Sequence, residues 1–148
     1  MASELISVSA TASSTASAEQ VYALLVDGQT WPQWSAVKSF TLVRPGADAP
    51  EGVGAIRQWN SGLMATREQI VELEPPTKFA YTLLSSTLVA VRDYRADVDI
   101  TPTATGCTVV WSAVFRPKLP GTGWLWRLAL GRLSASLARG VAEYAARS

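Results

Sequence analysis

"VRDYRADVDITPTATGCTVVWSAVF", residues 91–115, decides the fold because it contains two strand patterns separated by one turn. Alternate residues of its first half form a mainly apolar set and a charged set, namely Arg92, Tyr94, Ala96, Val98 and Ile100 against Asp93, Arg95, Asp97 and Asp99. A period of two is typical of a strand with one face on a core. The segment "TPTATG" carries turn residues, and a short turn makes the two strands antiparallel neighbours. We therefore expect a hairpin whose acidic face is solvated.

The same strand pattern extends toward the N-terminus. Runs rich in Gly, Pro, Asn, Asp and Ser, such as "RPGADAPEG", "NSG" and "EPPT", separate further apolar segments. The predicted strands lie near residues 37–44, 53–60, 64–74, 78–85, 89–101 and 107–116. An earlier segment, "ELISVSAT", alternates in the same way and predicts a first strand.

Two short helices are predicted between the first and second strands. In "SAEQVYALL", Ser17 and Gln20 have the spacing of a capping box, and the helix is expected to end where Gly28 takes a left-handed conformation. In "TWPQWS", Thr30 is a candidate N-cap, with Pro32 in the first helical turn.

The C-terminal segment "GTGWLWRLALGRLSASLARGVAEYAARS" predicts one long amphipathic helix. Its apolar stripe comprises Trp126, Leu130, Leu133, Leu137, Val141 and Tyr144. Trp124 and Leu128 fall on the opposite face, where we expect them to pack on the short helices. A cavity mouth, a second subunit or a membrane surface are the alternatives.

The amino-acid composition excludes several classes of function. The chain has 148 residues, 48% of them hydrophobic, which fits a single domain over residues 1–148. A net charge of +1 argues against a nucleic-acid partner. The chain has no histidine, and its one cysteine, Cys107, allows no intrachain disulfide or cysteine-based metal cluster. We expect a soluble cytoplasmic protein without a cofactor, metal or stable membrane insertion, either monomer or homodimer.

These elements together predict an α+β fold. Seven strands form a curved antiparallel sheet wrapped around a long C-terminal helix, and the two short helices lie between the first and second strands. One helix cannot fill the concave side of such a sheet. We therefore expect a cavity between the sheet and the helix.

The order and spacing of four segments resemble the START-like, helix-grip (SRPBCC) superfamily, in its polyketide cyclase/dehydrase-like branch. These are "SAEQVYALLVDGQTWPQW", "IRQW" followed by "TREQIVELEPPTKFAYTL", the hairpin quoted above, and the closing helix. The resemblance covers nearly the whole chain and implies a helix-grip fold with an apolar ligand cavity. It implies no single reaction, because relatives include aromatase/cyclases and lipid and hormone carriers.

Counting in twos along each strand gives the candidate ligand-binding residues. Arg92 and Tyr94 share a face with Val98 and are expected to point into the cavity. The other candidates are Arg57, Arg67, Trp59 and Tyr81, with Arg57 and Arg67 as cross-strand neighbours across "NSG". Glu68 has the opposite parity from Arg67, which weakens it as a proton acceptor.

Two classes of function fit these residues. The first is a binding module for a polyketide, lipid or aromatic metabolite, which arginine and tyrosine orient. The second is a cofactor-independent cyclase or dehydratase that stabilises an enolate with arginine and tyrosine. A protein-interaction domain with a closed cavity is a third possibility. Two features favour binding: the chain has no histidine, and no carboxylate falls on the inward parity beside the arginines.

Overall fold

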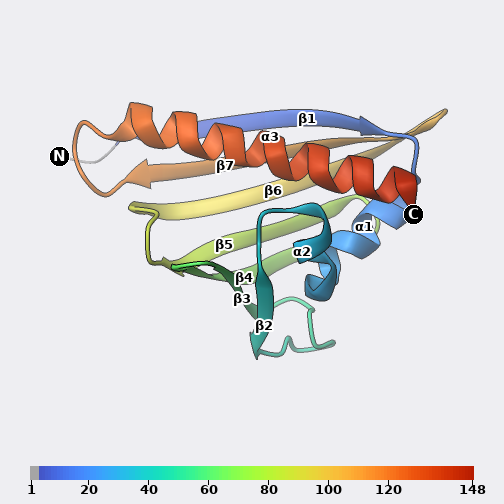
Figure 1. Ribbon diagram of the computed structural model, residues 1–148, viewed down its shortest axis with the longest axis horizontal. Helices are drawn as coiled ribbons and strands as arrows, with labels where there is room; N and C mark the ends of the chain where they lie inside the picture. Colours follow the sequence, from blue (N-terminus) through green and yellow to red (C-terminus); the bar gives the residue numbers. More distant parts are fainter. Residues whose placement is uncertain (1–3) are drawn as a thin grey trace.

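The computed structural model describes residues 4–148, which form one antiparallel sheet and a set of helices on one face of it (Figure 1). The strands are β1 (Ile6–Ser14), β2 (Ser39–Arg44), β3 (Ile56–Ser61), β4 (Met64–Glu74), β5 (Lys78–Ser86), β6 (Val91–Thr103) and β7 (Gly106–Pro117). They are arranged in the order β1-β7-β6-β5-β4-β3-β2. The predicted helix-grip architecture and seven-stranded sheet are confirmed.

The β6–β7 hairpin is the longest pairing of the sheet. Its register sets Val98 opposite Trp111 and Ile100 opposite Val109, all buried under the helices. On the outer face, Lys78 pairs with Asp97 and Asp99, and Arg95 pairs with Glu72 and Asp97. The alternation therefore gives one face in the core and one charged face in solvent, as predicted.

The first helix, α1 (Ala18–Val26), begins with the predicted capping box, in which Ser17 and Gln20 each bond the other's backbone amide. It does not end on a left-handed glycine. Instead Asp27 caps a 3-10 turn, η1 (Gly28–Thr30), that leads directly into α2 (Trp31–Trp34). Thr30 uses its hydroxyl to bond the carbonyls of Leu24 and Asp27 rather than to cap α2.

The long helix α3 (Gly123–Arg147) packs mainly on β1 and β7 and crosses in front of the sheet (Figure 1). Leu130, Leu137 and Val141 of the predicted stripe are buried, and Trp126 and Tyr144 are half-buried, but Leu133 is exposed. The expectation that Trp124 and Leu128 pack on the short helices is wrong, because both side chains are exposed. No helix among the described residues is both long and apolar enough to span a bilayer.

One glycine sets how closely α3 approaches α2. A Cβ atom at Gly140 would lie 2.2 Å from the backbone oxygen of Trp34, so only glycine fits this contact. The contact fixes α2 against the helix and closes one end of the space under α3. At Gly131, which lies earlier in the same helix, the nearest atom to an added Cβ is 3.8 Å away, on Val8.

Gly140→Ala should destabilise the protein by about 1–3 kcal/mol, because overpacking against a backbone oxygen exceeds the helix-propensity gain of alanine. Gly131→Ala is the matched control in the same helix. It should be neutral or stabilising by up to about 1 kcal/mol. Urea unfolding of both variants measures the difference, and equal stability of the two would show that α2 yields to the added methyl group.

Candidate ligand-binding site

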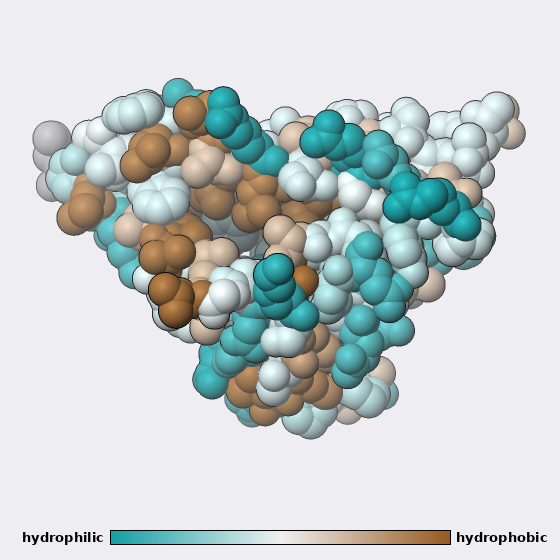
Figure 2. Space-filling view, in the orientation of Figure 1, coloured by the Kyte–Doolittle hydropathy of each residue, from teal (hydrophilic) through white to brown (hydrophobic). Residues whose placement is uncertain are grey.

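A cavity of about 140 Å³ lies between the sheet and α3. Its walls come from the end of α2, strands β3 to β6, and the middle of α3, and Figure 2 shows a hollow with apolar surroundings beside this helix. The lining residues are Trp31, Ser35, Ala36, Val37, Trp59, Ser61, Met64, Thr66, Glu68, Tyr81, Leu83, Val89, Tyr94, Leu130, Leu133 and Leu137. An apolar cavity of this size holds a ring-sized organic molecule.

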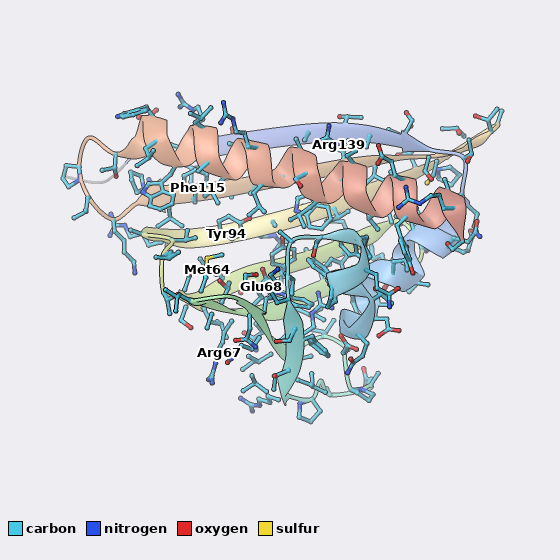
Figure 3. The ribbon with its side chains drawn as sticks, viewed as in Figure 1. Met64, Arg67, Glu68, Tyr94, Phe115 and Arg139 are labelled. Atoms are coloured by element: carbon cyan, nitrogen blue, oxygen red, sulfur yellow. The ribbon has the colours of Figure 1, made fainter. Side chains whose placement is uncertain are left out.

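Glu68 is the ionisable acid of the cavity. Its side chain projects inward from β4, and the residue is only 8% exposed (Figure 3). One carboxylate oxygen accepts a hydrogen bond of 2.7 Å from the indole Nε1 of Trp59. Burial raises the pKa of Glu68 to about 7, although the charge of Arg57 and the Trp59 hydrogen bond favour the ionised form. Near neutral pH this carboxyl therefore populates both its protonated and its ionised form.

Arg57 lies behind this part of the cavity wall and is fully buried on β3. Its Nη1 donates to the carbonyl of Leu25 at 3.0 Å and to Glu51 at 3.2 Å. The guanidinium carbon lies 5.1 Å from the ring centre of Trp31, 4.8 Å from that of Trp59 and 5.1 Å from that of Phe79. Burial lowers the pKa of Arg57, and the charges of Glu68 and Glu51 oppose that shift. The aromatic faces and the Glu51 carboxylate thus take the place of water around this cation.

Two tyrosines from adjacent strands supply the hydroxyl groups. Tyr81 on β5 and Tyr94 on β6 have ring centres 6.4 Å apart, and the Nε1 of Trp111 donates to the Tyr81 hydroxyl at 3.3 Å. Burial raises the pKa of both phenols, and the nearby Glu68 charge adds to the shift. Both tyrosines are therefore protonated at neutral pH and can donate to a ligand oxygen.

The structure brings half of the candidate residues to the cavity. Trp59, Tyr81 and Tyr94 line it, while Arg57 is buried in the adjacent core. Whether these residues contact a ligand stays a prediction. Among residues 4–148, no three Cys, Asp or Glu side chains form a cluster suited to a metal ion.

The expectation that Arg92 points into the cavity is wrong, because Arg92 is exposed at the start of β6. The β6–β7 register shifts between Arg92 and Arg95, and Asp93 has a φ of 55°. This bulge places two outward residues, Arg92 and Asp93, between the inward Val91 and Tyr94. Side chains do not alternate across such a bulge. Counting in twos from Val98 therefore predicts the inward position of Tyr94 correctly and that of Arg92 wrongly.

The expectation for Arg67 is also wrong. Arg67 is exposed and bonds Gln58 at 2.8 Å, and it points away from the cavity in Figure 3. Its cross-strand partner is Gln58, whereas Arg57 stands opposite Glu68. Strict alternation along β4 puts Arg67 on the same face as Val71, but a register shift between Ile70 and Glu72 reverses the alternation before Arg67 is reached. Counting back from Ile70 instead would have placed Glu68 inside.

Glu68 makes stability depend on pH in a defined direction. A carboxyl whose pKa is raised on folding binds protons more tightly in the native state, so this group's contribution to stability falls as pH rises from about 4.5 to about 7. The loss should approach about 3 kcal/mol. Glu68→Gln keeps an oxygen for the Trp59 bond and should remove this loss. Denaturant unfolding at pH 5 and pH 8 compares the two proteins, and parallel pH profiles would contradict the assignment.

Comparisons with known proteins agree with this fold. The family described as Polyketide cyclase / dehydrase and lipid transport matches residues 6–147. An uncharacterized protein of Mycobacterium tuberculosis is 29% identical over 129 residues, which are 82% of this chain and 75% of the relative.

Solved structures show the same architecture at low sequence identity. A START superfamily protein from Mycobacterium smegmatis has a TM-score of 0.78 at 14% identity, covering 97% of each chain. Norcoclaurine synthase from Thalictrum flavum, solved with a transition-state analogue, has a TM-score of 0.76 at 14% identity, covering 99% of this chain and 98% of that one. This chain therefore belongs to the polyketide cyclase/dehydrase and lipid transport family.

Proposed function

We propose that the protein binds a hydrophobic small molecule, a polyketide, lipid or aromatic metabolite, in the cavity under α3. The observation that carries the proposal is the composition of the cavity wall. Leucine, methionine, valine and tryptophan side chains form most of it, and Glu68, Tyr81 and Tyr94 are its buried polar groups. This combination of a broad apolar wall with a few placed polar groups is typical of small-molecule sites.

The polar groups narrow the chemistry of the ligand. Tyr81 and Tyr94 are protonated and can donate to a carbonyl or ether oxygen, whereas Glu68 accepts from a hydroxyl or amine when ionised and donates when neutral. The buried cation Arg57, whose guanidinium lies over Trp31 and Trp59 of the cavity wall, is paired with Glu51. A neutral, oxygen-bearing aromatic or acyl ligand therefore fits better than a carboxylate. A larger ligand places one ring or acyl segment inside.

A pair of tryptophan substitutions tests the site. Leu83 lines the cavity, and its neighbour Leu84 is exposed on the other face of β5. A ligand at 100 times its dissociation constant should stabilise the wild type by about 2.7 kcal/mol. Leu83→Trp fills the cavity and should abolish the thermal shift, while Leu84→Trp should keep it.

The screen uses fatty acids, sterols, flavonoids and aromatic polyketides. Undiminished binding to Leu83→Trp would place the ligand elsewhere. No shift with any compound in the wild type would favour the alternative of an interaction domain whose cavity takes no ligand.

A second candidate function is a cyclase or dehydratase, and the placement of Glu68 favours it. A carboxylate inside the cavity can take the proton from a carbon next to a carbonyl, while a tyrosine hydroxyl donates to the enolate oxygen. The same proton can later pass to a hydroxyl group that leaves as water. The pKa of about 7 suits a group that both takes and returns a proton. No cofactor enters this scheme.

If the protein is an enzyme, Glu68→Gln should lower kcat by about 100-fold or more and change ligand affinity little. Arg67→Gln is the matched control, because Arg67 neighbours Glu68 but is exposed outside the cavity. Chromatographic assays of any compound that binds, with each variant, measure the split between kcat and affinity. Turnover by Glu68→Gln at the wild-type rate would exclude this role.

A further inference from the structure

The topology gathers three connections at one end of the sheet. In an antiparallel meander alternate connections share an end, so the β3–β4 turn, the β5–β6 loop and the β7–α3 loop lie together (Figure 1). Each of them presents one exposed leucine: Leu63 is 98% exposed, Leu88 66% and Leu119 60%. We name these three residues the leucine tips. Single exposed leucines are ordinary, but one on each connection of the same end forms a distributed apolar surface.

Two of the leucine tips, Leu63 and Leu88, adjoin the cavity. Leu63 precedes Met64, and Leu88 precedes Val89, and both followers line the cavity. On the helix side, Leu133 lines the cavity while remaining exposed. Figure 2 shows apolar residues gathered over this end of the molecule. A surface that covered the leucine tips would therefore also adjoin the cavity mouth.

The first turns of α3 extend this surface. Trp124 and Leu125 are both exposed there, directly after the loop that carries Leu119. The tryptophan ring has an apolar body and a polar indole N–H, a combination that suits the boundary between water and lipid headgroups. The neighbouring Arg127 is also exposed.

The same end carries excess positive charge. Arg92 begins β6, Arg116 and Lys118 end β7 and start the next loop, and Arg127 lies on α3. Arg116 lies 3.7 Å from Asp93, and Arg127 lies 3.7 Å from Glu4. Of these described residues four are basic and two are acidic, whereas the net charge of the whole chain is only +1. This end is therefore more positive than the chain as a whole.

We propose that this end of the protein docks reversibly on an anionic lipid bilayer. The leucine tips and Trp124 enter the headgroup region, and the surrounding basic side chains attract the lipid charge. Protruding apolar residues combined with lysine and arginine are the two signals that peripheral membrane binding requires. The charge complementarity selects an anionic membrane rather than a neutral one. The proposal does not depend on which ligand, if any, occupies the cavity.

Vesicle co-sedimentation tests the proposal. The wild type should bind vesicles of phosphatidylcholine mixed with phosphatidylglycerol, bind pure phosphatidylcholine weakly, and be released by added salt. A Leu63→Ser, Leu88→Ser double variant should lose affinity on the order of tenfold or more. Lys118→Glu should weaken binding to the anionic vesicles selectively.

Val53→Ser provides the matched control, because Val53 is an exposed apolar residue in the β2–β3 loop at the opposite end of the sheet. It should bind vesicles like the wild type. The variants change exposed side chains, so unchanged thermal unfolding verifies that each is folded. Leu83→Trp, with its cavity filled, should still bind vesicles, which separates docking from ligand binding.

Three results would overturn the proposal. The first is wild-type protein that fails to bind anionic vesicles at low salt. The second is equal vesicle binding by the wild type and the double serine variant. The third is that the wild type binds no vesicles but forms a dimer in sedimentation velocity, and that the double serine variant is a monomer. The leucine tips would then contact a second copy of the chain.

Discussion

The guanidinium of Arg57 lies out of contact with water, and its Nη1 connects β3 with the end of α1 and with the β2–β3 loop. It bonds the carbonyl of Leu25 at the end of α1 and the carboxylate of Glu51 in the β2–β3 loop, while its own backbone belongs to β3. A buried cation is costly unless it is paired, so these partners must stay in place for the fold to persist. The position of α1 and α2 over the sheet depends on this arrangement.

The aromatic residues around Arg57 connect it to the cavity. Trp59 stacks on Trp31 with ring centres 4.4 Å apart, and its indole N–H holds Glu68. The direct ion pair of Arg57 is with Glu51, so Glu68 feels the cation only through its longer-range charge. Burial therefore dominates the titration of Glu68. Because Arg57 pairs directly with Glu51 and only at longer range with Glu68, the pKa of Glu68 stays near 7 inside the apolar cavity wall.

The element order and the sheet were predictable from the sequence because apolar residues alternate along nearly every strand and turn residues separate one strand from the next. Strand boundaries differ from expectation by at most a few residues, as for β3, which begins at Ile56 rather than near residue 53. The candidate site was only partly predictable. Trp59, Tyr81 and Tyr94 were found at the cavity by counting in twos, but Arg67 and Arg92 were misplaced and Glu68 was undervalued. Each error crosses a bulge, and neither bulge contains a glycine or proline to reveal it.

The bulge in β6 also separates two kinds of sequence change. Because Arg92 and Asp93 both face outward beside the inward Tyr94, the charge at the mouth end of the strand can vary without altering the cavity wall, and the wall can vary without altering the charge. In a regular strand Arg92 would share the inward face with Tyr94, so a change of charge at this position would also change the cavity wall. The irregularity thus makes surface and interior independently evolvable, which suits a fold whose relatives differ widely in what they do.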